Sequence, residues 1–289
     1  MAADTPPAAP EPSRPAVPRS ITLHVSPHIR EVDPEGLVAD LRSAARAVPE
    51  ILIRGDLLAD AQAAGRRPDT RKAAVALATG RVRSAYVAHE YLPAAPGEEA
   101  FEMQVDGDAA PAALASLAGR MYDGERAARA ALPLIAPAER ATDRVHVWAT
   151  RRLLVTYSTD DYRYHARYAV HGYPTVFSVL ALRYAPAPSR EAELHGMALL
   201  SRGVPREAAE EAVAQAFAGE AFDPSDTALV TRALASATLQ ACARAAGLAP
   251  FCEDARCRLY NPHRRPEFIR SILGASVCAR HRGWFCGDP

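Results

Sequence analysis

The chain has 289 residues, of which 49% are hydrophobic and 24% charged, and this balance excludes a wholly disordered or collagen-like protein. Lysine plus arginine and aspartate plus glutamate both number 34, so the formal net charge is zero. Zero net charge disfavours nucleic acid or an acidic membrane as the main partner, and no apolar run approaches the about 18 residues that a membrane span requires.

The N-terminal segment, residues 1–19, is rich in proline and alanine and cannot bury apolar surface, so we expect it to be disordered. It contains no apolar run of the kind found in a secretory signal. Four of the five cysteines follow residue 250, and in a chain without a signal such clustering indicates metal binding before it indicates a disulfide framework. We therefore expect a cytoplasmic protein.

Residues 20–132 predict an N-terminal part in which strands and helices alternate. Short apolar or alternating runs predict strands at residues 21–25, 50–54, 81–91 and 101–105. Amphipathic or alanine-rich runs predict helices at residues 34–45, on both sides of 65–68 within 56–79, and at 111–132. Asp33 and Pro34 are typical of the start of the first of these helices.

Residues 133–289 predict a C-terminal part that begins with a connector over 133–141. We expect two strands joined around Thr150–Arg152, two more within 163–184, a polar loop and then two helices. The strands are expected at 145–148 and 153–157, and the helices at 205–217 and 225–246. Ser225 or Asp226 can cap the longer helix and Gly247 can end it. The layout predicts an α/β fold with a mixed sheet and helices.

The strongest chemical signal is a cluster of cysteine and histidine near the C-terminus. Cys252 and Cys257 are separated by four residues, Cys278 and His281 by two, and 20 residues lie between the pairs. Thiolate and imidazole are good zinc ligands, and four protein ligands leave no open position, as in a structural zinc site. Cys286 is an alternative fourth ligand. Incidental thiols or a regulatory disulfide are the competing interpretations.

The stretch Gln240–Cys257 (QACARAAGLAPFCEDARC), followed by Cys278-Ala-Arg-His281, resembles the archaemetzincin family of zinc metallopeptidases. Gly247 matches the glycine of the family motif H-E-x-x-H-x-x-G-x-x-H-C-x4-C-x-M, and the cysteine pair follows it. The resemblance covers roughly residues 140–285. It implies a zincin-like fold and a second, non-catalytic zinc held by the cysteines.

The catalytic half of the motif is missing. With Gly247 aligned, Gln240, Ala241 and Arg244 replace the first histidine, the glutamate and the second histidine. An amide is a poor zinc ligand, a guanidinium offers no lone pair, and alanine cannot act as a general base. The resemblance therefore implies a member of a metallopeptidase family that has lost this catalytic site.

Three functional hypotheses follow. The first is a non-catalytic protein that binds a peptide or protein, with Gln240 and Arg244 as cleft candidates and Arg244 available for an anion. The second is an active zinc-dependent hydrolase with non-standard ligands that the sequence does not identify. His165 and His171 can lie on one strand face, but about 20 Å apart if that strand is extended, which is too far for one metal ion unless the chain turns. The third is a nucleic-acid-binding zinc knuckle that uses arginines near His281.

Overall fold

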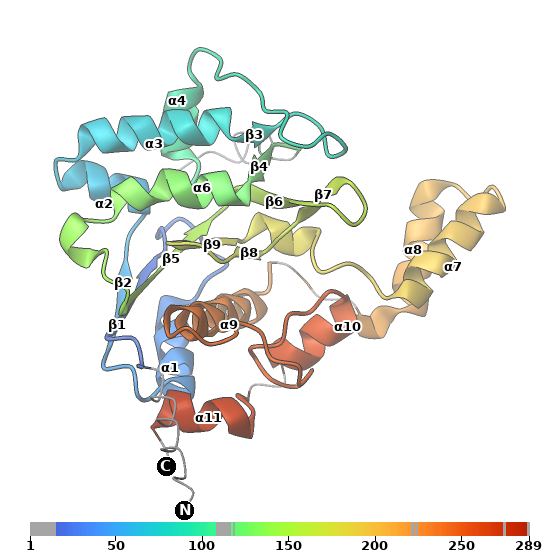
Figure 1. Ribbon diagram of the computed structural model, residues 1–289. Coiled ribbons are helices and arrows are strands. Elements are labelled where there is room, and N and C mark those ends of the chain that lie inside the picture. The colour runs from blue at the N-terminus through green and yellow to red at the C-terminus, as the bar shows by residue number, and fades with distance from the viewer. Residues whose placement is uncertain are drawn as a thin grey trace, which may run out of the picture.

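A computed structural model describes residues 16–107, 117, 119–220, 223, 225–273 and 276–287, so most of the expected N-terminal tail lies outside the described residues. The main element is a five-stranded sheet between two layers of helices, which confirms the mixed α/β fold (Figure 1). Its strand order is β2 (Glu50–Arg54), β1 (Ser20–His24), β5 (Arg144–Thr150), β9 (Thr175–Ser178) and β8 (Ala169–Val170). The strands are parallel except β8, the antiparallel strand at the edge.

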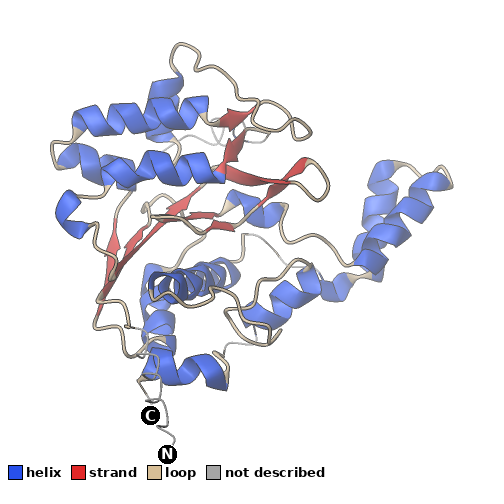
Figure 2. Ribbon diagram, viewed as in Figure 1, coloured by secondary structure: helices blue, strands red, loops and turns tan. Residues whose placement is uncertain are grey.

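A second, smaller sheet lies beside the first (Figure 2). Its order is β3 (Arg81–Val82), β4 (Met121–Asp123), β6 (Leu153–Ser158) and β7 (Arg163–Ala166). As the sequence predicts, the strands β5 and β6 are joined around Thr150–Arg152, but they belong to different sheets. The chain turns between them at Arg152, whose fully buried guanidinium is held by Glu102 and Asp106.

Side-chain alternation along the strands builds a core on each face of the main sheet. Ile21 and Leu23 of β1 belong to the cluster that includes α1 (Pro34–Ala44) and α9 (Thr227–Ala245). Trp148 of β5 belongs to the opposite cluster. The helices of that layer are α2 (Leu57–Ala63), α3 (Arg67–Thr79) and α6 (Gly124–Ala131).

The long helix α9 lies centrally in its layer. Asp226 caps it by accepting hydrogen bonds from the backbone N–H groups of Ala228 and Leu229, as the sequence predicts. Burial extends around most of the helix, because residues 229–243 are all buried except Arg232. Alanine, serine and threonine dominate this segment, and such small side chains allow neighbours to pack closely on several sides.

Two predicted segments of the N-terminal part are wrong. Residues 81–91 form a strand only at Arg81–Val82, and residues 101–105, predicted as a strand, lie mainly in α4 (Glu98–Gln104). Of the helix predicted at 111–132, residues 111–116 and 118 lie outside the described residues, and the rest contains β4 and α6. Asp123 separates these two elements, because its carboxylate caps α6.

The region after the sheets contains a helical arm. The sequence predicts α8 (Arg206–Ala216) but not α7 (Arg190–Ser201), which Ser189 caps. The two helices pack against each other and project from the rest of the molecule (Figure 1).

The C-terminal segment packs below α9. A short helix, α10 (Arg265–Phe268), lies between the two ligand pairs and is followed by a π turn over Ile269–Leu273. The last helix, α11 (Ala279–Cys286), contacts α1 and buries Trp284 and Phe285. No helix in the described part of the chain is both long and apolar enough to cross a bilayer. The main sheet takes strands from both sides of residue 132, and a division of the chain there stays a prediction.

Candidate functional site

The structure brings the four expected ligands together. The ligand atoms of Cys252, Cys257, Cys278 and His281 all lie within 4.8 Å of one another. The Sγ atoms of Cys252 and Cys278 are 3.8 Å apart, and Nδ1 of His281 lies 3.1 Å from Sγ of Cys278 and 3.9 Å from Sγ of Cys257. This is the single group of three or more metal-donor side chains found among the described residues.

These distances fit one tetrahedral zinc ion. With Zn–S bonds of about 2.3 Å and a Zn–N bond of about 2.0–2.1 Å, tetrahedral ligands lie about 3.8 Å apart for two sulfurs and about 3.6 Å for sulfur and nitrogen. The S–S separation matches the first value, and the two S–N separations lie on either side of the second. The donor set therefore fits a metal ion that prefers soft and borderline ligands in a closed tetrahedral site.

Local structure positions each ligand. Cys252 and Cys257 follow α9 in a loop, where isolated bridges pair them with Tyr260 and Ser276. Cys278 is the N-cap residue of α11, and His281 lies in the first turn of that helix. Two backbone N–H groups approach the sulfurs at 3.4 Å, that of Asp254 toward Cys252 and that of Cys278 toward Cys257. A shared ion would thus join the loop after α9 to α11.

Burial makes the thiolate form of these cysteines costly unless a cation lies beside them. The side chains of Cys257 and His281 are buried, and desolvation raises the pKa of the Cys257 thiol to about 12. Desolvation also raises the pKa of Cys252 and lowers that of His281. Cys286 is not part of the group, since its Sγ atom faces the carbonyl oxygen of Ala44 at 3.8 Å.

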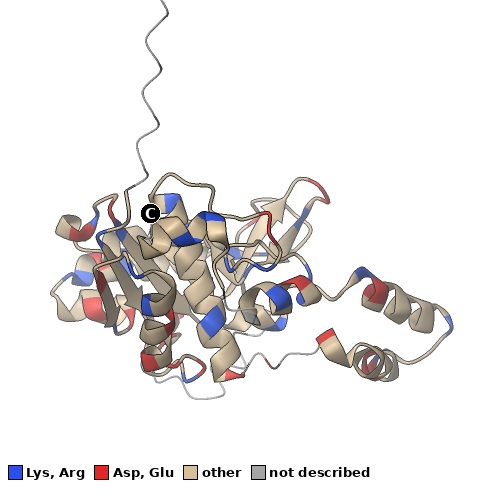
Figure 3. Ribbon diagram, turned by 90° about the horizontal axis from the view of Figure 1, so that it is seen from below, with Lys and Arg blue, Asp and Glu red and all other residues tan. Residues whose placement is uncertain are grey.

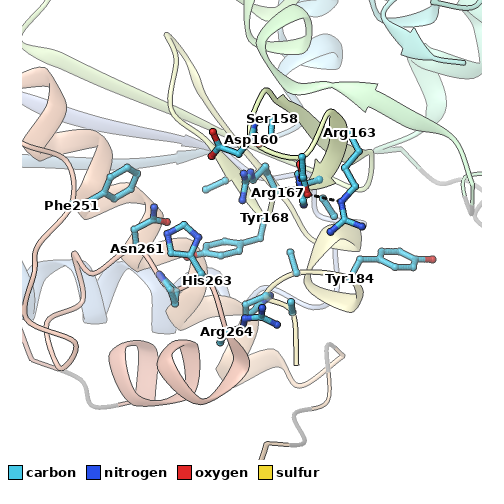
Figure 4. A pocket seen from close by; sticks show the side chains of 18 of the residues that line it. Ser158, Asp160, Arg163, Arg167, Tyr168, Tyr184, Phe251, Asn261, His263 and Arg264 are labelled. Carbon is cyan, nitrogen blue, oxygen red and sulfur yellow. Dashed lines mark hydrogen bonds and ion pairs between the residues drawn. The ribbon is translucent and has the colours of Figure 1, made fainter. Parts of the chain in front are cut away.

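A cleft of about 450 Å³ lies between the two sheets' edges and the C-terminal segment (Figure 4). Its walls come from β7, from β8, from residues 184–187 and from residues 261–264, and Gln240 of α9 lies at its floor. Gln240 is only 1% exposed. Arg244 is exposed and lines a different hollow, of about 350 Å³, beside His146 and Tyr173. The two cleft candidates therefore face different cavities.

The floor of the cleft contains a hydrogen-bond chain that fixes one histidine tautomer. Gln240 donates from Nε2 to the carbonyl oxygen of Tyr260 (3.0 Å), so its Oε1 atom is the one that faces Nε2 of His171 (3.1 Å). Nε2 of His171 must then carry the proton and donate it to the amide. Nδ1 of His171 is left as a buried lone pair with no hydrogen-bond partner among the residues that the structure describes. Sequence reasoning missed this contact, which spans 69 residues of chain.

Burial keeps His171 neutral. Desolvation lowers the pKa of His171 to about 4, although its hydrogen bond to Gln240 opposes the shift. His165 and His263 line the same cleft. His165, on β7 of the smaller sheet, bonds through Nε2 to the carboxylate of Asp161 at 2.8 Å. His171 follows β8 of the main sheet, so the expectation that the two histidines share one strand is wrong.

We expect this histidine to make stability depend on pH. The unfolded chain takes up a proton near pH 6.5 but the folded chain resists protonation until about pH 4, so His171 stabilises fully above pH 6.5 and its contribution is lost as pH falls to 4. Between pH 7 and 4.5 the loss should be roughly 2–3 kcal/mol. Urea unfolding of wild type and His171→Gln at both pH values measures it, with His263→Gln as the surface control. An identical pH slope in wild type and His171→Gln contradicts this assignment.

A family model described as "Probable metallopeptidase family (DUF6775)" matches residues 17–286. No curated protein and no solved structure matches the chain. The match covers both sheets, the cleft and all four candidate metal ligands. The chain therefore belongs to this metallopeptidase family.

Proposed function

We propose that this protein binds an extended peptide segment in the Gln240 cleft without hydrolysing it, and that one structural zinc ion held by Cys252, Cys257, Cys278 and His281 stabilises its C-terminal segment. The single observation that carries the proposal is the contrast between a complete four-ligand group and a cleft floor occupied by an amide. Because the three cysteines must stay reduced to bind zinc, the proposal places the protein in the cytoplasm.

The proposal extends the archaemetzincin-like interpretation to an inactive member of such a lineage. Gln240 uses its amide in hydrogen bonds to His171 and Tyr260, so the side chain at the first ligand position is engaged in packing the floor. Ala241 is a buried methyl group and Arg244 faces the second hollow. None of the three residues supplies a metal ligand or a general base.

The edge strand β8 supports an extended peptide as the ligand. In its antiparallel pair with β9, Tyr168 accepts a hydrogen bond from Ser178, which makes the next pair, Ala169 with Phe177, the one without ladder hydrogen bonds. The N–H and C=O groups of Ala169 therefore point away from β9, and Ala169 lines the cleft. A peptide strand can add to such an edge through main-chain hydrogen bonds.

Charge supports a peptide rather than nucleic acid. Acidic and basic residues are interspersed over the face of the molecule seen from below, in agreement with the zero net charge (Figure 3). Two of the cleft arginines form ion pairs, Arg163 with Asp161 and Arg264 with Glu193. A surface of this kind lacks the single-sign field that attracts a phosphate backbone.

The proposed function predicts binding without cleavage. Random hexapeptides should bind the purified protein in fluorescence anisotropy and remain intact in mass spectrometry after long incubation. Tyr184 is 52% exposed and lines the cleft, so Tyr184→Ala should weaken binding about tenfold. The control is Tyr162→Ala, which removes another exposed tyrosine, 70% exposed, that does not line the cleft. Equal affinity in Tyr184→Ala and Tyr162→Ala contradicts the location, and peptide cleavage contradicts inactivity.

A hydrolase with non-standard ligands is the second candidate, and the lone pair on Nδ1 of His171 favours it. This neutral histidine shares the cleft with His165 and His263. Metal analysis distinguishes the two candidates, because the hydrolase needs a second metal ion in addition to the one at the cysteines.

A further inference from the structure

One cation in the cleft, Arg167, forms no ion pair with an acidic group in the described part of the chain. Arg163 pairs with Asp161 at 2.7 Å, Arg264 with Glu193 at 2.7 Å, and His165 with Asp161 at 2.8 Å. Arg167 also lines the cleft, but no ion pair joins it to any described residue. Burying an unpaired charge costs free energy, so an arginine without an ion pair in a cavity indicates that a ligand supplies the negative charge.

The contacts of Arg167 leave one end of its guanidinium available. Its Nε atom donates to Oγ1 of Thr156 at 2.9 Å, and its backbone N–H donates to the carbonyl oxygen of Leu154. These contacts fix the backbone of Arg167 and the Nε side of its guanidinium. No hydrogen bond to a described residue uses its two terminal nitrogens, whose N–H groups form a planar fork suited to a carboxylate. Figure 4 shows the head of Arg167 inside the cleft, between Asp160 and Tyr168.

The partial burial of Arg167 also favours the binding of an anionic ligand to its guanidinium. The side chain is only partly exposed, and desolvation lowers the pKa of its guanidinium. Tyr168 and Asp161 oppose this shift, but Asp161 forms its ion pairs with Arg163 and His165. A hydrogen bond between charged groups in a partly dry cavity contributes more than one in water.

We infer that the peptide bound in this cleft carries an acidic group, a C-terminal carboxylate or an aspartate or glutamate side chain, and that the terminal nitrogens of Arg167 bind it. The inference rests on the proposed function, because it names the chemical class of the ligand at the same site. Ala169 lies two residues from Arg167 on the same stretch of chain, so one peptide can bond to the β8 edge and present its acidic group to Arg167.

Matched peptides test the inference. Hexa-alanine with a free C-terminus, its C-terminal amide, and amidated versions with a central glutamate or glutamine are titrated into wild type, Arg167→Met and Arg163→Gln. In wild type, at least one acidic peptide should bind tenfold or more tightly than its neutral counterpart, since a hydrogen bond to a charged group contributes about 1.5–3 kcal/mol. Which of the two acidic peptides gains affinity identifies the source of the carboxylate.

Arg167→Met should abolish this difference and leave the affinity of the neutral peptides unchanged. Arg163→Gln should retain the difference. Equal affinity of acidic and neutral peptides for wild type, or a difference that persists in Arg167→Met, overturns the inference and leaves peptide binding intact. If no peptide binds, the proposed function fails, and N-acetylglycine against N-acetylglycinamide then tests Arg167 alone by NMR titration. Competition by inorganic phosphate as strong as that of N-acetylglycine would also overturn the assignment to a carboxylate.

Discussion

Replacing Cys257 with serine is expected to remove the zinc ion and lower the melting temperature by about 10 °C. Cys257 is fully buried in the main core, and its Sγ atom lies near Nδ1 of His281 on a different element. Loss of a structural metal is among the mutational mechanisms that cost about 4 kcal/mol or more. In a chain of this size about 2–4 °C of melting temperature corresponds to each kcal/mol.

The control for this variant is Cys286→Ser, which changes a cysteine of α11 outside the ligand group. It should keep its zinc and melt within about 2 °C of wild type, as expected for a substitution away from special features. A chelator should lower the melting temperature of wild type and of Cys286→Ser, but not that of Cys257→Ser. A chelator without effect on wild type would mean that the cluster contributes no metal-dependent stability.

Replacing Arg152 with methionine is expected to destabilise the fold by about 3–5 kcal/mol, because it leaves two carboxylates buried without a counter-charge. The guanidinium donates to Glu102 at 2.9 Å and to Asp106 at 2.6 Å, and all three side chains are at most 2% exposed. The two carboxylates hold the pKa of Arg152 above its usual value despite complete burial. Tyr122 completes the network by donating its hydroxyl to Glu102 at 2.8 Å.

Arg71→Met provides the comparison. Arg71 pairs with Glu99 at 3.1 Å on the surface, with its own side chain 76% exposed, and such pairs contribute about 0–1 kcal/mol. Urea unfolding at neutral pH should separate the two variants clearly. A loss below 1 kcal/mol in Arg152→Met would contradict the view that this ion network fixes the turn between the two sheets.

The sequence predicted the elements whose signals are local. The apolar run EILIR became β2 with the expected bounds, and the Asp226 cap with Gly247 after the helix marked both ends of α9. The spacing of Cys252, Cys257, Cys278 and His281 predicted four ligands that the fold brings within 4.8 Å. In these places the residues that determine the structure are neighbours in the chain or belong to one motif.

The errors arise where distant partners decide the structure. Residues 101–105 alternate like a strand, but five residues cannot distinguish this pattern from little more than one helical turn. Glu102 is buried in an ion pair with Arg152, which lies 50 residues later in the chain. The separation of β5 and β6 into different sheets also depends on distant partners, since β5 pairs with β1 and β6 pairs with β4.

The contacts in the cleft also depend on residues that are distant in the sequence. The sequence identified Gln240 as a cleft candidate but not its partner, because His171 lies 69 residues away. The unpaired state of Arg167 could not be read either, since it depends on which acidic groups the fold leaves to other cations. The amide of Gln240 in the cleft is the feature that favours a binding protein over a hydrolase.

X-ray absorption at the zinc edge, combined with metal counting on the purified protein, measures the proposed metal centre and the proposed lack of a catalytic metal together. We expect about one zinc ion per chain, bound by three sulfurs at about 2.3 Å and one nitrogen at about 2.0–2.1 Å. A protein without zinc, or with zinc bound only by nitrogen and oxygen, would contradict the metal centre. A second zinc bound by nitrogen and oxygen would contradict the non-catalytic cleft.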